Sequence, residues 1–431
     1  MSIKTLHVTN SWHKESGGVA TFYRELLKAA EDRERPMRLV VPAAAYGEEP
    51  HGRYGRIYHV PGSPSRLSPG YSLIMPKSYL LPRSPLRQIL AAERPDLVEC
   101  CDKYTLNYLA ALLRRGWLLG AGYRPAVVAL SCERMDENMA RYVSGSTVAM
   151  RFCRFYMKRL YFSMFDHHIV VSPDAAGELR EAARGHHLRR GVWLRPMGVD
   201  SGLFRPDRAD CDVRAWLRLL AGGPESGVLL LYVGRLALEK NIHLLIETME
   251  ILERETPGTF HLIVAGNGPL RAAFERDCER RVPGAVRLLG HIGDRELLAD
   301  ILANCDIFLH PNPREPFGIA PLEAMASGLA LVAPDAGGVT CYANAGNAWL
   351  APADAASFAS AVRSIWRDPD TTAARRRAAR GTAQQFDWQR VTGGFFDLYD
   401  ELHDLVRGAR HDPRSAPAFF STPGDRWGNE I

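Results

Sequence analysis

The chain has 431 residues, a net charge of +5 and 46% hydrophobic residues, which predicts two or three folded domains and argues against wholesale disorder. Its eight cysteines form no C-x-x-C pair, so no zinc site is expected. Scattered cysteines of this kind indicate a reducing, cytoplasmic location. The N-terminus looks like a first strand rather than an export signal, and the apolar runs are far shorter than the ~20 residues that span a bilayer. The chain is therefore expected to be soluble or peripheral to a membrane.

The charge is unevenly distributed along the chain. Residues 1–200 carry 29 Lys and Arg against 19 Asp and Glu, whereas residues 201–431 carry 25 against 30. This asymmetry suggests two domains with different partners. The basic first half could face an anionic acceptor or an anionic membrane surface, and the alternative is a solvated surface that binds nothing.

Short apolar runs alternate with longer helical stretches, a pattern typical of α/β domains with parallel sheets. The strands expected in the first half are Thr5–Thr9, Arg38–Pro42, Leu97–Glu99, Ala126–Leu130 and His168–Val171, with helices such as Thr21–Ala30 and Ser84–Glu93 between them.

Two further segments of the first half stand apart. Pro61–Pro85 is too long for an ordinary connection and is predicted to be a functional loop. Thr147–Phe165 is aromatic and basic, which would suit a helix on a membrane surface. A half-buried helix whose arginines reach solvent is the favoured interpretation of that stretch.

The second half repeats the α/β pattern more clearly. The expected strands and helices are Val228–Val233, His261–Ala265, Val286–Leu289, Ile307–His310 and Ala330–Ala333, and Asn241–Glu255, Leu270–Arg280, Asp294–Asn304, Ala320–Ser327 and Asp354–Arg367. Turn-forming residues gather at Trp193–Pro206. We therefore predict doubly wound domains at 1–195 and 196–385, a helix over 386–410 and a loosely ordered tail over 411–431.

Glycines mark two strand-to-helix turns. Gly17 and Gly18 follow the first strand, where backbone N–H groups could approach a phosphate at the start of a helix. Gly266 and Gly268 follow the strand that ends at Ala265 in the same way. Either pair could instead serve close packing of an ordinary turn.

Two cations follow the first strand of the second half. Arg235 and Lys240 lie at the carboxyl edge of the predicted sheet, and Lys240 is expected to open the next helix, an arrangement suited to a diphosphate. The chain has seven Lys against 47 Arg, and Lys240 is the only Lys after Lys158. A compact ammonium in an arginine-rich chain suggests a geometric need. The alternative is a surface charge at a helix start.

A pair of glutamates follows the strand Ile307–His310. Glu315 lies in a loop and Glu323 in the next helix, and both could accept hydrogen bonds from sugar or ribose hydroxyls. The backbone at Phe317 and Gly318 offers N–H groups between them. An unrelated pair of surface carboxylates is the alternative.

Taken together and in this order, these motifs resemble those of the retaining glycosyltransferases of family 4, which have the GT-B fold. Glu315 and Glu323 match the E-x7-E motif of that family, and Arg235 and Lys240 match its phosphate-binding cations. Phe386 to Trp388, followed by a helix to about Tyr399, resembles the closing helix that returns to the first domain. The resemblance is specific over about 194–400 and looser over 1–193.

The resemblance implies an α/β, GT-B protein: two Rossmann-like domains that face a cleft, with the acceptor bound by the first and a nucleotide sugar by the second. It implies a metal-independent, retaining hexosyltransferase with Arg235, Lys240 and Glu315 as catalytic residues. The implied nucleotide-sugar-binding residues are Gly17, Gly18, Gly268, Phe317, Gly318 and Glu323. Neither a cofactor nor a metal is expected.

The implied substrates are a UDP- or GDP-type nucleotide sugar and a glycan, lipid-linked or small-molecule acceptor, for example in cell-envelope glycan synthesis. The expected location is the cytoplasm, with peripheral contact to an anionic membrane and no nucleic-acid partner. Many family members carry a His after the strand that is Ala126–Leu130 here. This chain has none there, and Cys132, Glu133 or Arg134 could take its position.

Three other functions remain open at this point. A nucleotide-sugar epimerase or a sugar phosphorylase would have the same fold, and Lys240 would be the second domain's one candidate for a pyridoxal lysine. A subunit that binds a nucleotide sugar without turnover is the non-enzymatic alternative, and the missing His favours it. Arg235, Lys240, Glu315 and Glu323 argue against it.

Overall fold

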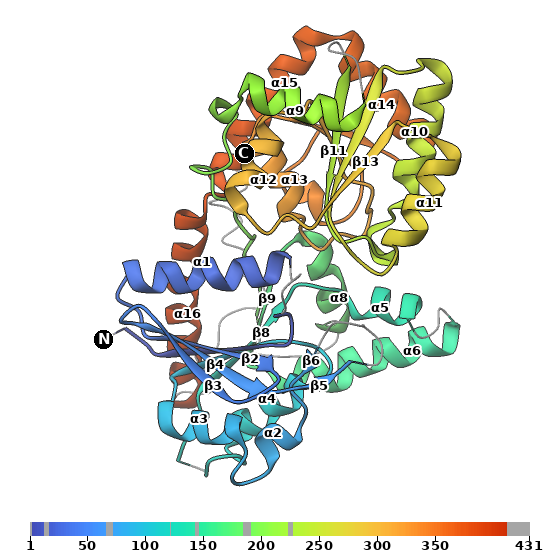
Figure 1. Cartoon of the computed structure of the whole chain (residues 1–431). Coiled ribbons are helices and arrows are strands. Elements are labelled where there is room, and N and C mark those ends of the chain that lie inside the picture. The colour runs from blue at the N-terminus through green and yellow to red at the C-terminus, as the bar shows by residue number, and fades with distance from the viewer. Residues whose placement is uncertain are drawn as a thin grey trace. The chain divides into compact units, whose positions relative to one another are not determined.

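A computed structural model describes residues 2–12, 17–65, 72–120, 122–142, 146–183, 191–222 and 227–411. The chain divides into two compact units, coloured from blue to red along the chain in Figure 1. Unit 1 consists of Met1–Pro196 and Val391–Ile431, and unit 2 consists of Met197–Arg390. The sequence placed the first division between residues 195 and 196. The predicted tail, apart from His411, lies outside the described residues.

Unit 1 is built on a sheet of eight strands in the order β10-β9-β8-β7-β1-β2-β4-β3. Neighbouring strands are parallel except β3 and β4, which form an antiparallel pair. The strands are β1 Thr5–Thr9, β2 Met37–Ala43, β3 Gly47–His51, β4 Gly55–Pro61, β7 Leu97–Cys101, β8 Ala126–Ser131, β9 His167–Val170 and β10 Val192–Leu194.

The antiparallel edge corrects the expectation of wholly parallel sheets. The sequence did not predict β3 or β4. The residues of β3, Gly47–His51, are largely exposed and polar, so they lack the apolar alternation that marks a strand. Antiparallel edge strands of this kind are common on otherwise parallel sheets.

Helices lie on both sides of this sheet, with α1 on one side and α2 and α3 on the other (Figure 1). They are α1 Gly18–Asp32, α2 Lys77–Leu80, α3 Pro85–Glu93, α4 Leu106–Arg115, α5 Met135–Tyr142, α6 Thr147–Tyr156, a π-helical turn Met157–Tyr161, α7 Phe162–Met164, α8 Pro173–Ala183 and α16 Trp388–His411.

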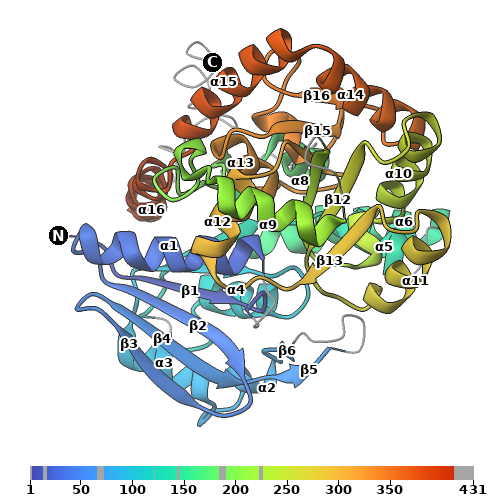
Figure 2. The ribbon, with the colours of Figure 1, turned by 45° about the horizontal axis from the view of Figure 1, so that its top comes forward.

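The segment Pro61–Pro85, expected to be a loop, contains regular secondary structure. It holds the short antiparallel strands β5 Ser63–Pro64 and β6 Ser72–Leu73 and the helix α2, while residues 66–71 lie outside the described part. Ile74 and Tyr79 are fully buried, which explains why this stretch carries apolar residues among its turn formers. Figure 2 shows β5 and β6 next to α2.

Helix α16 joins the two units in sequence, and from Val391 onward it belongs to unit 1. Its Phe395 packs on Phe22 of α1, with ring centroids 4.8 Å apart. Its Tyr399 donates a 2.7 Å hydrogen bond to Glu99, a fully buried carboxylate at the centre of the unit 1 sheet. The predicted closing helix is thus present, and it continues beyond Tyr399 to His411.

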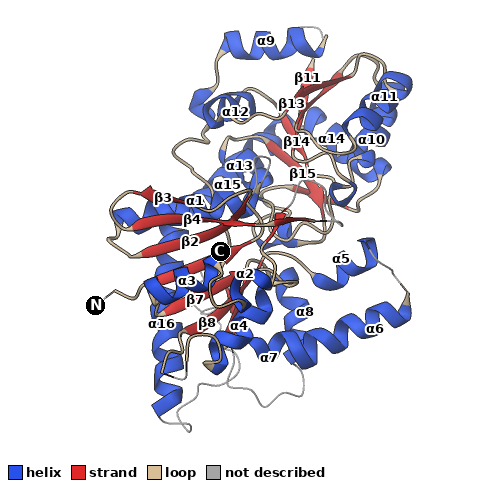
Figure 3. Cartoon of the chain, turned by 60° about the horizontal axis from the view of Figure 1, so that its bottom comes forward, coloured by secondary structure: helices blue, strands red, loops and turns tan. Residues whose placement is uncertain are grey.

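Unit 2 is built on a parallel sheet of six strands in the order β13-β12-β11-β14-β15-β16. Helices α9 and α12 lie on one side of it and α10 and α11 on the other (Figure 1), and Figure 3 shows helices and strands in separate colours. The strands are β11 Val228–Val233, β12 Phe260–Ala265, β13 Val286–Gly290, β14 Ile307–Leu309, β15 Ala330–Pro334 and β16 Trp349–Ala351.

The apolar strands of unit 2 are covered by amphipathic helices, and Met249, Phe274 and Phe358 are fully buried against them. The α-helices are α9 Cys211–Ala221, α10 His243–Glu255, α11 Arg271–Arg281, α12 Arg295–Ala303, α13 Ile319–Ala326, α14 Ala355–Arg367 and α15 Pro369–Gln385. Each sheet is thus wound with helices on both sides, as the sequence predicted. No helix of the described ranges has the length and apolarity that crossing a membrane would require.

Candidate functional site

The order of strands in unit 2 creates a switch point at its centre. Strand β11 lies between β12 and β14, so the chain leaves β11 in one direction and β14 in the other. The loops at the carboxyl ends of these two strands are therefore neighbours, which is where open α/β sheets bind ligands. The loop after β11 carries Arg235 and Lys240, and the loop after β14 carries Glu315.

Lys240 does not open a helix as the sequence suggested. It ends a short 3-10 turn, Leu238–Lys240, and Asn241 then adopts a left-handed conformation (φ 52°) before α10 begins at His243. Asn241 is one of the few residue types that tolerate this conformation, and its side chain donates to the carbonyl of Pro311 at 3.0 Å. The turn joins the loop after β11 to the loop after β14.

Lys240 and Glu315 form an ion pair at this junction. The Lys240 Nζ lies 2.6 Å from Glu315 Oε2 and 2.9 Å from Oε1, although 75 positions separate the residues. The amide of Asn312 donates to the same Oε2 at 3.0 Å. The Glu315 side chain is 15% exposed and the Lys240 side chain 28%, so both charges are partly withdrawn from water.

Electrostatics keep this carboxylate ionised. Burial would raise the pKa of Glu315, but the charge of Lys240 and the hydrogen bonds from Lys240 and Asn312 outweigh it and lower the pKa to about 2. His310 is 6% exposed, directly after β14, and burial lowers its pKa to about 4. At neutral pH the loop therefore holds an anionic Glu315 beside a neutral imidazole.

Glu323 has different surroundings. It lies on α13, is 4% exposed, and accepts a 3.1 Å hydrogen bond from Arg295 of α12. Burial raises its pKa, and the nearby Arg295 partly opposes that rise. The structure thus gives the two predicted glutamates separate cationic partners, one from the loop after β11 and one from a neighbouring helix.

The residues between the two glutamates form the start of α13. Gly318 is its N-cap residue with φ 87°, a conformation that favours glycine, and Tyr342 donates to its carbonyl at 2.5 Å. The Phe317 side chain is buried against Tyr342 and Phe386. Only the backbone of Phe317 and Gly318 is thus available for the predicted role, at a helix N-terminus where N–H groups favour anions.

The glycine turn after β12 has a packing role. A Cβ atom on Gly266 would lie 1.8 Å from the carbonyl oxygen of Gly234, and one on Gly268 would lie 2.4 Å from that of Leu236. These carbonyls belong to the loop that carries Arg235, whose own carbonyl accepts from Tyr232 at 3.1 Å. The glycines let the two loops touch and so fix the course of the Arg235 loop.

The remaining predicted residues lie in unit 1. Gly17 is exposed and is the N-cap residue of α1, whose first residue is Gly18. Both follow β1, which lies at the switch point of the unit 1 sheet. After β8, where the sequence lacks a His, the Glu133 carboxylate accepts from Asn138 at 2.8 Å. Burial raises the pKa of Glu133. The Lys103 ammonium, 2% exposed, donates to the Glu133 carbonyl at 2.5 Å.

Sequence reasoning missed three residues that lie around Glu315 and Glu323. His310 and Asn312 both follow β14, so their position at a strand's carboxyl edge was the available indication. Arg295 begins α12 and gave no such indication, because its contact with Glu323 depends on how α12 packs beside α13.

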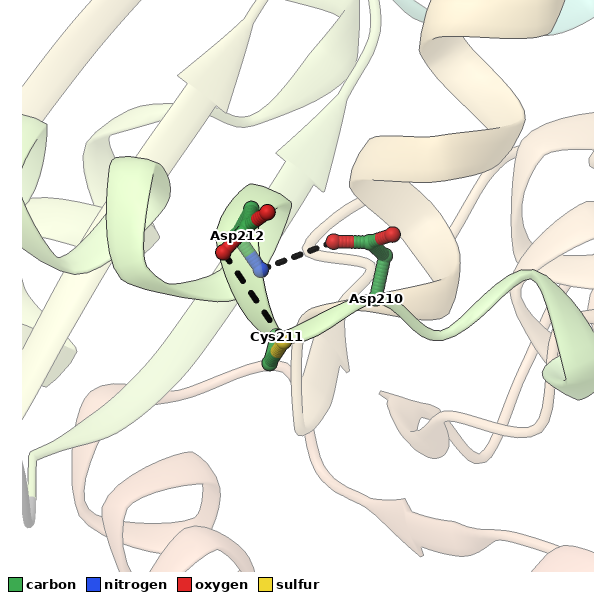
Figure 4. A group of neighbouring side chains, drawn as sticks. All are labelled: Asp210, Cys211 and Asp212. Atoms are coloured by element: carbon green, nitrogen blue, oxygen red, sulfur yellow. Dashed lines mark hydrogen bonds between the residues drawn. The ribbon is translucent and has the colours of Figure 1, made fainter.

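One group of residues in the described ranges has the spacing of metal ligands, namely Asp210, Cys211 and Asp212 (Figure 4). All three are exposed. Asp210 is the N-cap of α9 and accepts from the backbone N–H groups of Asp212 at 2.7 Å and Val213 at 3.2 Å. Helix capping thus accounts for this cluster.

Comparison with protein families gives the two units a common identity. Residues 17–191 match the family model described as a glycosyl transferase 4-like domain, and residues 222–382 match the model described as glycosyl transferases group 1. The chain is a glycosyltransferase. Solved structures agree with the GT-B fold: sucrose-phosphate synthase from Thermosynechococcus elongatus superposes with a TM-score of 0.71 at 20% identity, covering 93% of this glycosyltransferase and 99% of that chain.

HepE from Anabaena, solved in complex with UDP, superposes with a TM-score of 0.68 at 18% identity over 93% of the glycosyltransferase and 100% of that chain. In sequence, the glycosyltransferase is 29% identical over 392 residues to a GDP-mannose-dependent alpha-(1-6)-phosphatidylinositol dimannoside mannosyltransferase of Mycobacterium tuberculosis, spanning 90% of this chain and 94% of the relative. A glycogen synthase of the same organism is 40% identical over 174 residues, 39% of this chain and 42% of the relative.

Proposed function

We propose that this glycosyltransferase is a retaining, metal-independent enzyme of family 4 that transfers a hexose from a nucleoside-diphosphate sugar. The observation that carries the proposal is the Lys240–Glu315 pair, 2.6 Å apart at the switch point of the unit 2 sheet. A cation for the diphosphate and a carboxylate for the sugar are thereby held side by side at the edge of the sheet where ligands bind.

The chemistry of the leaving group explains the cations. As the bond between the sugar C1 and the phosphate oxygen breaks, negative charge develops on the departing diphosphate. Lys240 and Arg235 supply positive charge, and the N-terminus of α13 supplies backbone N–H groups. A new C1–oxygen bond forms to the acceptor hydroxyl, whose proton leaves to the released phosphate or to solvent.

In this proposal the two glutamates bind different parts of the donor. Glu315, kept anionic by Lys240 and oriented by Asn312, accepts hydrogen bonds from hydroxyls of the transferred sugar. Glu323, buried and oriented by Arg295, accepts hydrogen bonds from the ribose. Donor binding then weakens the Lys240–Glu315 contact, because the diphosphate attracts the same ammonium.

The mannosyltransferase from Mycobacterium tuberculosis matches 90% of this chain, and its name gives a first choice of substrates. We propose GDP-mannose as the donor and a mannosylated phosphoinositide, or a glycolipid with a similar anionic head group, as the acceptor. The excess of basic residues in the first 200 positions suits an anionic acceptor.

The test measures nucleoside-diphosphate release from GDP-mannose, UDP-glucose and ADP-glucose, each with and without a phosphatidylinositol mannoside. The proposal expects acceptor-dependent release of GDP and a product whose new linkage keeps the α-configuration of the donor. Inverted stereochemistry would overturn the retaining mechanism. A donor epimerised without any acceptor would identify an epimerase, and donor binding without release by any combination would identify a binding subunit.

A further inference from the structure

An apolar and basic surface lies on the helix that runs from α6 through the π-helical turn. Val148, Phe152 and Phe155 recur at positions i, i+4 and i+7, so they share one face of α6. Their exposed fractions are 78%, 59% and 56%, and Leu160 on the following turn is 46% exposed. Isolated exposed apolar residues are ordinary, but a row of them along one helix marks an interaction surface.

The opposite face of the same helix is already used. Cys153, Tyr156 and Met157 are buried, and α6 packs beside α5. Figure 3 shows α5 and α6 extending together at the outer edge of unit 1. The helix is thus half-buried with its arginines in solvent, as the sequence favoured, and the exposed apolar row is a different set of residues from its buried face.

Cations border the apolar row on one side. Arg151, Arg154 and Lys158 recur at i, i+3 and i+7, and Arg159 is exposed on the next turn. The Arg154 side chain is 58% exposed, and its nearest carboxylate, on Glu181, is 3.9 Å away. Residues 147–165 contain no Asp or Glu. The helix thus presents aromatic and positively charged groups together.

We propose that this surface, formed by Val148, Arg151, Phe152, Arg154, Phe155 and Lys158, docks unit 1 onto an anionic membrane leaflet. An amphipathic helix whose aromatic side chains enter the acyl boundary while its cations contact lipid phosphates has this composition. The charge selects a lipid leaflet over a second copy of this chain, because a copy would bring the same cations together. The inference deepens the proposed function, since a lipid-linked acceptor would then be met in its own membrane.

The proposal is tested with the full chain and two kinds of vesicle, phosphatidylcholine alone and equal parts of phosphatidylcholine and phosphatidylglycerol. We expect co-sedimentation with the mixed vesicles at low salt, and release at high salt as the charges are screened. The double substitution Phe152→Ser and Phe155→Ser is expected to leave the protein in the supernatant. The triple substitution Arg151→Gln, Arg154→Gln and Lys158→Gln is expected to weaken binding on the order of 100-fold, about 5-fold per cation.

Matched controls remove the same kinds of groups elsewhere. Leu219→Ser changes an 80% exposed apolar residue on α9, and Arg276→Gln changes an exposed cation on α11. Both should sediment like the unsubstituted protein. Because all substituted residues of the surface are exposed or half-buried, the variants are expected to keep their thermal unfolding midpoint, which is measured alongside.

Several results would overturn the proposal: a protein that stays in the supernatant with mixed vesicles at low salt, surface variants that sediment as well as the controls, or a dimer that the double substitution dissociates. The proposed function is read separately, as acceptor-dependent release of GDP from GDP-mannose in the absence of vesicles. A chain that binds mixed vesicles through this surface but uses no donor would support the surface and reject the function. A chain that turns over a water-soluble acceptor and does not bind vesicles would support the function and reject the surface.

Discussion

Lys240 and Glu315 constrain each other in the folded chain. Each charge loses water on burial, and removing one partner leaves the other unpaired in a partly buried place, which costs more than the pair contributes. The same contact also prepares a cation and an anion for two parts of one donor molecule. A pair of this kind at the carboxyl edge of a sheet fits a functional role better than a stabilising one.

Replacing the cation should slow the reaction, in addition to the stability that the unpaired Glu315 costs. Lys240→Ala is expected to lower the rate of diphosphate release roughly 10²–10³-fold, since it removes a charge that acts on the leaving group. Lys240→Arg should recover part of the rate, because it restores the charge with a different shape. Lys28→Ala, an exposed lysine of α1, is the control and should leave the rate unchanged. Equal rates for Lys240→Ala and the control would remove Lys240 from the mechanism.

The two glutamates should respond differently to loss of charge. Glu323→Gln is expected mainly to raise the KM for the donor, because a ribose contact is the same in the ground and transition states. Glu315→Gln is expected also to lower kcat, because a contact to a sugar that becomes cationic strengthens in the transition state. Steady-state kinetics with GDP-mannose separate the two parameters, and the opposite pattern would reverse the assignment.

His310 should make unit 2 sensitive to moderate acid. Its pKa is lowered to about 4 by burial, so the unfolded chain takes up a proton at higher pH than the folded chain does. Its contribution to stability is full above the usual pKa of about 6.5 and is lost as the pH falls toward 4. Between pH 7 and pH 5 we expect His310→Gln to lose about 1–2 kcal/mol less stability than the unsubstituted protein.

Thermal or urea unfolding at the two pH values measures this difference. His291→Gln, which changes an exposed histidine of unit 2, is the matched control and should follow the unsubstituted protein. If His310→Gln loses as much stability between pH 7 and pH 5 as the control does, the imidazole is not held neutral by its surroundings.

At the scale of elements, helix α16 is attached to unit 1 through a buried polar group as well as through apolar packing. Glu99, in the middle of β7, accepts hydrogen bonds from Tyr399, from Tyr23 of α1 at 2.9 Å and from His7 of β1 at 2.9 Å. A buried carboxylate needs such partners, and three elements supply them. The network specifies where α16 lies on unit 1, which packing of Phe395 on Phe22 alone would fix less strictly.

Removing one hydroxyl from this network should cost stability without touching the site of unit 2. Tyr399→Phe is expected to reduce the free energy of unfolding by about 1–2 kcal/mol, the usual effect of taking a donor from a buried acceptor. Tyr46→Phe, whose hydroxyl bonds Glu48 at an exposed position, is the control and should change stability by less than about 0.5 kcal/mol. Chemical denaturation gives both values, and equal effects would show that the Glu99 network adds nothing.

At the scale of the whole molecule, the proposed reaction depends on positive charge that the chain itself supplies. Arg235 and Lys240 lie on one loop, and that loop is held against the turn after β12 by the close approach of Gly266 and Gly268. Fixed cations at the leaving group need no reorganisation during the reaction, so protein side chains could serve where other transferases use a divalent ion.

The proposal therefore predicts that chelation leaves the reaction intact. Diphosphate release from GDP-mannose should proceed at the same rate, within error, with an excess of EDTA or with added Mg²⁺ or Mn²⁺. Recovery of a lost rate by added metal after chelation would reject the metal-independent mechanism. The Lys240→Ala variant, assayed in parallel, should remain slow under all of these conditions because added metal does not replace the ammonium.

Much of this architecture follows from the sequence. Strands such as Thr5–Thr9 and Val228–Val233 are predicted with the bounds that the structure has, because short runs rich in β-branched and apolar residues mark strands. The glutamate pair and the isolated Lys240 are visible as residue types in the segments that follow two strands. The edge strand β3 was not predicted, because polar, exposed residues pair there through their backbones and leave no pattern in the side chains.

Tertiary structure alone decided which of these residues meet. Lys240 contacts Glu315 because β11 and β14 are neighbours, and strand order depends on how the crossover helices pack rather than on local spacing. Burial, and with it the lowered pKa of His310, likewise arises from the surrounding layers. The exposed face of α6 could be separated from its core face only once Cys153 and Tyr156 were known to be buried. Local sequence fixes an element's periodicity, but its partners are set by contacts between residues far apart in the chain.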